Sequence, residues 1–152
     1  MMEKRIAIDQ LEPQSFEAVR ALEKYLAQSQ LTPIHKELIK IRASQLNGCA
    51  FCLDMHTKDA LKYGEAPQRI FLLDAWRETD LFTEEERAIL QVTEEVTLIS
   101  KQGLTTATYE TALKALGENY LAQVIVAIAT INVWNRLAVS THKPVPHIPT
   151  VL

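Results

Sequence analysis

The sequence predicts an all-α fold, a single-domain antiparallel helical bundle of about six to seven helices that spans residues 1–152. Three observations lead to this prediction. Apolar residues recur at three- and four-residue spacing along nearly the whole chain, which is the period of an amphipathic helix. No segment shows the alternating pattern of a half-buried strand. Only 4 glycines and 6 prolines occur in 152 residues, which argues against a disordered or loop-rich chain.

The helix boundaries follow from capping residues and turn formers. Pro33 suits the first turn of a helix, and Pro67 opens another. Asn47-Gly48 ends a helix, because glycine readily adopts the left-handed conformation found after a helix C-terminus. Thr83 and Glu86 have the spacing of a capping box, followed by an apolar periodic segment. The expected helices are 15–30, 33–46, 49–63, 67–78, 83–100, a short one between residues 103 and 117, and 118–141.

The last expected helix is apolar on more than one face, and a helix of this kind is buried on more than one side. A chain of 152 residues has a limited capacity to bury such a surface by itself. The sequence therefore predicts that a second subunit covers part of this helix in a homo-oligomer. The apolar residues concerned are Leu121, Val124, Ile125, Ile128, Ile131, Val133 and Trp134.

Composition and charge narrow the class of protein. The net charge of −3 has no basic block behind it, so the sequence lacks the phosphate-neutralising surface of a nucleic-acid-binding protein. The first residues are charged and have no long apolar run, so we expect a cytoplasmic protein without a signal peptide. The most apolar segment, 120–139, contains Gln123, Asn132, Asn135 and Arg136, which are too polar for an ordinary membrane span, so no membrane partner is expected.

The two cysteines of the chain lie three residues apart, in "NGCAFCLDMH". In a reducing cytosol, such a pair favours a catalytic or metal-binding role over a structural disulfide. On one helix, Cys49, Cys52 and His56 share a face, because their offsets are three, four and seven. Asn47 and Gly48 put Cys49 at or near the helix N-terminus, where free N–H groups and the helix dipole stabilise a thiolate.

A thiolate, a nearby base and a second sulfur are the minimal parts of a dithiol redox centre. The thiolate attacks a peroxide O–O bond or a disulfide, and the other cysteine resolves the product. His56 is one turn from Cys52 and is the candidate base. Glu37, twelve residues before Cys49, lies on the preceding expected helix and can orient His56 once the Asn47-Gly48 turn folds the two helices together. Lys36 and Lys40 flank Glu37, so from spacing alone an ordinary surface position is the favoured explanation of this residue.

The segment 33–65, and above all "ELIKIRASQLNGCAFCLDMHTKDALKYGE", resembles the core motif of the carboxymuconolactone decarboxylase superfamily, specifically its alkylhydroperoxidase AhpD-like branch. The shared pattern is a glutamate, a C-x-x-C twelve residues later, and a histidine four residues after the second cysteine. These positions are Glu37, Cys49, Cys52 and His56 in this chain. The resemblance extends more loosely over the whole chain, including "INVWNRLAV" in the last helix.

The resemblance implies a trimer or hexamer, a disulfide-forming Cys49/Cys52 pair, Cys52 as the attacking thiolate, and a proton relay of Glu37 and His56. It further implies a hydroperoxide substrate and an external thiol reductant, with a lipoyl protein or a peroxiredoxin as candidate partners, and no organic or metal cofactor. One position departs from the family pattern. AhpD proper has a second histidine two residues after the first cysteine, and here that position is Phe51. The relay is then shorter or runs through water, and strong peroxidase activity is less secure.

Two other interpretations remain open. Cys49, Cys52 and His56 are ligands of a type that zinc accepts, with Glu37 or His35 as a fourth. Structural zinc sites usually draw their ligands from two separated segments, whereas these three residues lie along one helix. The second interpretation is a non-catalytic oligomeric member of the superfamily in which both cysteines are simply buried.

Overall fold

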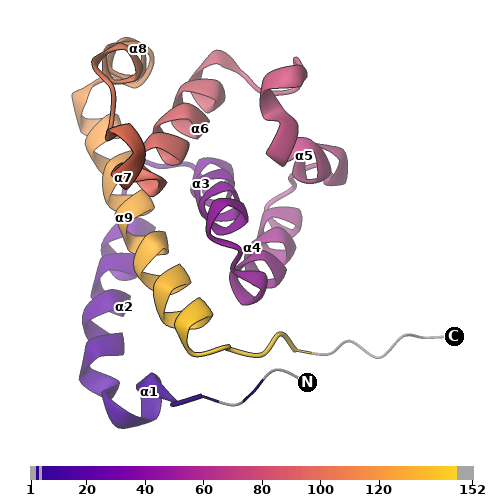
Figure 1. Cartoon of the computed structure of the whole chain (residues 1–152). Helices are drawn as coiled ribbons and strands as arrows, with labels where there is room; N and C mark the ends of the chain where they lie inside the picture. The colour runs from indigo at the N-terminus through magenta and orange to yellow at the C-terminus, as the bar shows by residue number, and fades with distance from the viewer. Residues whose placement is uncertain (1–2, 4, 147–152) are drawn as a thin grey trace, which may run out of the picture.

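The computed structural model describes residues 3 and 5–146, and every regular element in that part of the chain is helical (Figure 1). The predicted all-α fold is therefore confirmed. In chain order the elements are α1 (Ile8–Leu11), α2 (Pro13–Ala27), α3 (Pro33–Asn47), α4 (Ala50–Lys62), α5 (Pro67–Leu72), the 3-10 helix η1 (Leu73–Glu78), α6 (Glu84–Thr97), α7 (Ile99–Gln102), α8 (Thr106–Leu116) and α9 (Glu118–Ser140).

The structure refines the expected elements in the middle of the chain. The helix expected over 67–78 divides into α5 and η1, and Ala75 inside η1 has the non-helical angles φ −109° and ψ 28°. A tertiary contact holds η1 against α6, because Trp76 Nε1 donates a hydrogen bond to Glu94 Oε1 at 2.8 Å. The helix expected over 83–100 ends at Thr97, and the short α7 follows it. The predicted capping box of Thr83 and Glu86 is confirmed.

The core forms where α3, α6, α8 and α9 meet. Helix α3 packs against α4, α6 and α9, so it is at the centre of the fold (Figure 1). Fully buried aliphatic side chains, among them Ile39, Ile89 and Ile128, come together there. A second apolar cluster around Leu38, Leu73 and Leu90 fills the space between α3, η1 and α6.

Helix α9 turns one continuous face towards this core. Its inward residues, spaced three or four apart, are Leu121, Val124, Ile128, Ile131, Asn135 and Ala138. By length and composition α9 is the one helix of the described chain that is able to cross a membrane, which differs from the expectation drawn from its polar residues. In this fold it packs beside α2, α3 and α6, as the core helix of a globular protein does (Figure 1).

Candidate active site

The hairpin of α3 and α4 carries all four residues predicted for the site. Gly48 follows α3 with φ +64°, the left-handed conformation expected for this turn. The N–H of Cys49 then donates to the carbonyl oxygen of Ser44 at 3.0 Å, which closes the end of α3. This tight connection returns the chain so that α4 packs along α3. The fold thereby brings a side chain of α3, Glu37, next to a side chain of α4, His56.

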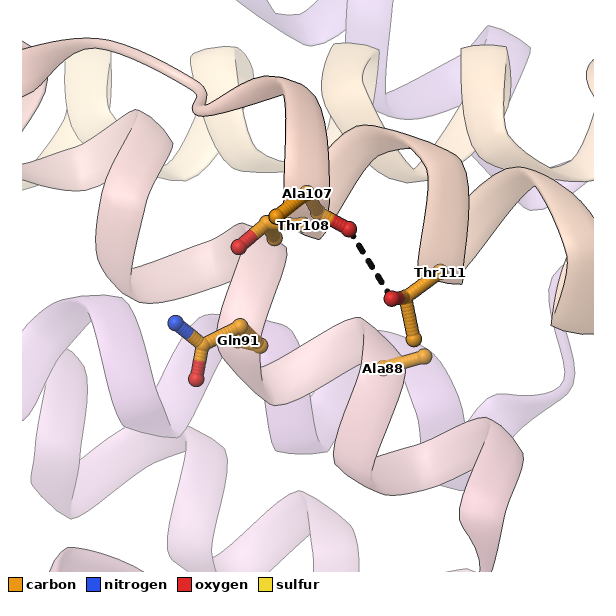
Figure 2. A pocket seen from close by; sticks show the side chains of 5 residues that line it. All are labelled: Ala88, Gln91, Ala107, Thr108 and Thr111. Atoms are coloured by element: carbon orange, nitrogen blue, oxygen red, sulfur yellow. Dashed lines mark hydrogen bonds between the residues drawn. The ribbon is translucent and has the colours of Figure 1, made fainter.

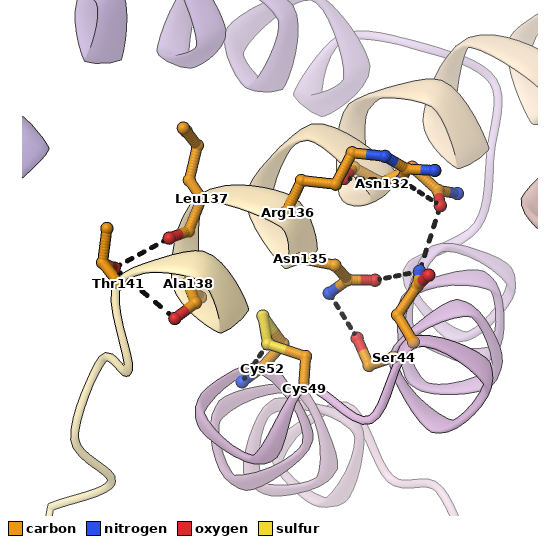
Figure 3. The surroundings of a disulfide bond; sticks show 10 residues. Ser44, Cys49, Cys52, Asn132, Asn135, Arg136, Leu137, Ala138 and Thr141 are labelled. Carbon is orange, nitrogen blue, oxygen red and sulfur yellow. Dashed lines mark hydrogen bonds between the residues drawn. A yellow bond between two sulfur atoms is a disulfide. The ribbon is translucent and has the colours of Figure 1, made fainter. Parts of the chain in front are cut away.

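Cys49 is the N-cap of α4 and not its first helical residue. Its Sγ accepts a hydrogen bond from the backbone N–H of Cys52 at 3.3 Å, as a serine or aspartate oxygen does at other N-caps. The same sulfur forms a disulfide with Cys52, with 5.4 Å between the two Cα atoms (Figure 3). The pairing implied by the family resemblance is thus present in this structure. Each cysteine is only 2% exposed, and both pack against Ala138 near the end of α9.

Glu37 and His56 form a buried pair. His56 Nδ1 lies 2.8 Å from Glu37 Oε2, and each residue is 5% exposed. With Glu37 as a carboxylate, which only accepts hydrogen bonds, Nδ1 is the donor, and the neutral form of the imidazole then has its lone pair on Nε2. Lys40 Nζ lies 3.9 Å from the other carboxylate oxygen of Glu37. The surface explanation of Glu37, which spacing alone left open, is therefore wrong.

A network of side-chain amides, two of them buried on α9, joins that helix to the turn that carries Cys49. Asn47 Nδ2 donates to Asn135 Oδ1 at 2.9 Å and to Asn132 Oδ1 at 3.0 Å. Asn135 Nδ2 in turn donates to Ser44 Oγ at 3.0 Å. The sequence analysis treated Asn132 and Asn135 only as polar interruptions of an apolar helix. A buried asparagine in line with the core stripe of α9 is the signal that indicates such a network.

Phe51 occupies the outer side of the cysteine pair. Its ring packs against the cluster formed by Cys49, Cys52 and Ala138. The ammonium of Lys143, which follows α9, lies 4.6 Å from the centroid of the Phe51 ring, a cation–π distance. The position that carries a second histidine in AhpD proper is thus occupied by an aromatic ring beneath a positive charge.

The potential metal ligands that the structure brings together differ from those expected. Ligand atoms of Glu37, His56 and Asp59 all lie within 4.8 Å of one another. The two cysteine sulfurs are engaged with each other in the disulfide. His35 points elsewhere, because its Nδ1 lies 2.6 Å from the hydroxyl oxygen of Tyr120. Burial lowers the pKa of His35, against the opposing charges of Glu86 and Glu85, so this imidazole favours its neutral form.

Two hollows on the described surface are lined by residues other than the cysteine pair. One, of about 170 Å³, lies between α6 and α8 and is lined by small and neutral side chains (Figure 2). There Thr111 Oγ1 donates to the carbonyl oxygen of Ala107 at 2.9 Å, so its hydroxyl is already engaged. A larger hollow of about 360 Å³ lies between α3, α4 and α5 and is mostly apolar. Neither is lined by Glu37, Cys49, Cys52 or His56.

The fold and the hairpin site define a class of small all-α proteins with a cysteine pair at a helix N-terminus beside a Glu–His pair. The chain belongs to the carboxymuconolactone decarboxylase family, whose family model matches residues 13–95. It is 40% identical to the Bacillus subtilis (strain 168) protein YdfG over 139 residues, which are 91% of this chain and 95% of that protein. The resemblance noted in the sequence is therefore confirmed.

Solved structures support the same assignment. A protein of unknown function from Agrobacterium tumefaciens, for which the role of the antioxidant defence protein AhpD has been suggested, superposes with a TM-score of 0.92 at 40% identity. The match covers 96% of this chain and 100% of the Agrobacterium protein. The debrominase Bmp8 shares the fold alone, with a TM-score of 0.80 at 18% identity over 90% of this chain and 74% of its own.

Proposed function

We propose that this protein is an AhpD-like thiol-dependent hydroperoxidase or disulfide oxidoreductase that uses Cys49 and Cys52 as its redox pair. Membership of the family and the likeness to the Agrobacterium protein support an antioxidant-related role. The observation that carries the proposal is the joint burial of a cysteine pair and a hydrogen-bonded Glu37–His56 pair on one helical hairpin.

The geometry supports different roles for the two cysteines. Cys52 is one helical turn before His56, whereas Cys49 is two turns before it, so His56 is better placed to take the proton of Cys52. Cys49 Sγ sits at the N-cap, within bonding distance of Cys52. Cys52 is therefore the attacking thiolate, and Cys49 is the resolving thiol. Glu37 accepts a hydrogen bond from Nδ1 of His56 and so orients the ring with Nε2 as the base.

The proposed reaction proceeds in three steps. The Cys52 thiolate attacks the terminal oxygen of a hydroperoxide, the O–O bond breaks, and the alkoxide takes the proton held by His56 and leaves as an alcohol. The Cys49 thiol then attacks the Cys52 sulfenic acid, forming the disulfide and releasing water. An external dithiol finally reduces the disulfide by thiol–disulfide exchange and is itself oxidised. The family resemblance suggests a lipoyl protein or a peroxiredoxin system as the partner in this last step.

Turnover of a small alkyl hydroperoxide with a dithiol reductant tests this proposal. Cys52→Ser and Cys49→Ser are each expected to abolish dithiol cycling. The matched control is Thr57→Val, which removes from the same hairpin a hydroxyl that donates within α4 to Leu53 O, and keeps both sulfurs. Hydroperoxide turnover by Cys52→Ser at the wild-type rate contradicts the mechanism.

A second candidate function is cation binding by Glu37, His56 and Asp59, whose ligand atoms lie close enough to share one ion. Such an ion competes with the His56–Glu37 hydrogen bond and with the ion pair of Asp59 and Lys62 at 2.7 Å. Metal analysis of protein purified without chelator separates the two functions. Stoichiometric metal that Asp59→Asn removes favours the cation site, and metal-free protein with full turnover favours the dithiol. Absence of both properties favours a non-catalytic member of the family.

We further propose that the protein works as a cytoplasmic homo-oligomer, a trimer or a hexamer by resemblance to the family. Large apolar side chains remain exposed on the single chain, including Phe71 at 79%, and Val133 and Val139 on the outer side of α9. Light scattering of the purified protein measures the mass directly. A monomer at micromolar concentration contradicts this part of the proposal.

A further inference from the structure

The buried amide of Asn135 occupies a position where the core stripe of α9 otherwise places apolar residues. Its relative exposure is 0%, and Ile131 and Ala138, one turn away on either side, are both buried and apolar. Burial of an amide is costly unless its donors and acceptor are engaged. Both ends of Asn135 are engaged with α3, because Oδ1 accepts from Asn47 Nδ2 and Nδ2 donates to Ser44 Oγ. The asparagine thus contacts two residues that bracket the last turn of α3.

Those two partners are the residues that set the position of Cys49. Asn47 ends α3, and the carbonyl oxygen of Ser44 accepts the backbone N–H of Cys49 at 3.0 Å. Cys49 has the extended angles φ −87° and ψ 91°, so its backbone belongs to the turn and not to α4. Cys52, in contrast, is fixed within the helix. The separation of the two sulfurs therefore depends on how firmly the turn is held against α9.

We infer that Asn135 is a positioning residue of the redox pair, one that holds the Asn47–Cys49 turn so that the Cys49 sulfur stays against Cys52. This inference rests on the proposed function, in which Cys49 closes the disulfide. Two thiols held in register have a high effective concentration towards each other, which favours the disulfide over the dithiol. Loss of the Asn135 hydrogen bonds lets the turn move, lowers that effective concentration and makes the disulfide easier to reduce.

The disulfide–dithiol equilibrium against glutathione measures this effect without any hydroperoxide. For Asn135→Ala we expect the equilibrium to shift towards the dithiol by about three- to tenfold, the factor that corresponds to losing one or two net hydrogen bonds. A residue that only stabilises the fold lowers the stability of both redox forms equally and leaves this equilibrium unchanged. The control is Thr130→Val. Thr130 is buried on the same helix, and its hydroxyl donates to Val126 O within α9.

A milder variant keeps the test decisive if Asn135→Ala does not fold. Ser44→Ala removes the acceptor of the Asn135 amide and retains the backbone bond to Cys49. It is expected to shift the equilibrium in the same direction by about twofold or more, and less than additively with Asn135→Ala. If both variants fold and their disulfide–dithiol equilibria equal that of the wild type within error, the inference is overturned. Peroxide turnover by Cys52→Ser overturns the proposed function instead, and the glutathione result does not depend on it.

Discussion

His56 Nδ1 and Glu37 Oε2 lie 2.8 Å apart between α4 and α3, and both residues are almost fully buried. A buried imidazole held in this way has a fixed ring orientation and one free basic nitrogen. The pair also places a potential proton acceptor one helical turn after Cys52. This relationship gives the first prediction.

Substitution of the relay residues slows peroxide turnover to different extents. His56→Gln removes the base and is expected to lower kcat/KM by about 10²- to 10⁴-fold, the usual contribution of general acid–base catalysis. Glu37→Gln keeps the base but loosens its orientation, so we expect a smaller loss, by about tenfold. The control is Asp54→Asn on the same helix, whose carboxylate pairs with Lys58. Equal losses in Asp54→Asn and Glu37→Gln contradict the relay.

Replacement of Phe51 by histidine restores the residue of AhpD proper at this position. The Phe51 ring packs on the cysteine cluster, so an imidazole there is close enough to exchange protons with the pair. We expect Phe51→His to raise hydroperoxide turnover by about tenfold, at the lower end of a general-base contribution. Phe51→Leu controls for loss of the ring and of its contact with Lys143. Identical rates for the two variants contradict a gain from proton transfer at this position.

The turn at Gly48 depends on its positive φ. A Cβ at this position meets no atom within 4 Å, so the cost of a substitution comes from the backbone conformation and not from a clash. Gly48→Ala is expected to lower the free energy of unfolding by about 1–2 kcal/mol, and Gly48→Asn by less, because asparagine tolerates the left-handed region. Urea unfolding of the wild type and both variants measures this order of unfolding free energies. A stability of Gly48→Ala equal to that of the wild type contradicts it.

Glu95 makes the stability of the fold depend on pH. Burial alone raises the pKa of this carboxyl group, but hydrogen bonds from the Thr108 hydroxyl, the Thr105 N–H, Gln91 and the Thr105 hydroxyl outweigh it and leave the pKa below its ordinary value of 4.5. A lowered folded-state pKa contributes stability that is present above about 4.5 and is lost as the pH falls through the folded-state value.

The variant Glu95→Gln is therefore expected to lose stability at neutral pH, by about 1–3 kcal/mol, and to lose less on acidification than the wild type. Urea unfolding at about pH 7 and about pH 4 measures both effects. Glu110→Gln, on the exposed side of α8, is the control and is expected to behave as the wild type. Parallel pH profiles for the wild type and Glu95→Gln exclude this carboxylate as the cause.

Much of the fold follows from local sequence signals. Helix periodicity, the prolines at positions 33 and 67, and the Thr83 capping box each act within a few residues, so they are sufficient to predict α3 and the starts of α5 and α6. The break at η1 was missed because its cause is tertiary. Trp76 bonds to Glu94 of α6, and Arg42 of α3 contacts Asp74, so distant helices impose the 3-10 conformation on a segment of helical pattern.

The candidate site divides in the same way. The spacing of Cys49, Cys52 and His56 along one segment predicts that they share a face of α4 and its N-cap. The family motif added Glu37 from the preceding helix. The position of Asn135 in the apolar stripe of α9 indicates that its side chain faces inward. Its partner Asn47 lies 88 positions away in the sequence, and no local pattern indicates that the two side chains meet. The Glu37, His56 and Asp59 group likewise depends on how α3 and α4 pack. The catalytic roles of these residues stay predictions.

The sulfur of Cys49 takes part in two interactions, since it caps α4 and also forms the disulfide with Cys52. Reduction of this disulfide would therefore alter the group that accepts the N–H of Cys52 in the first turn of α4. The local structure of the first turn of α4 and the oxidation state of the two cysteines would then be linked through Cys49 Sγ. We therefore expect the exchange of the Cys52 amide hydrogen with deuterated solvent to differ between the disulfide and dithiol forms of the chain.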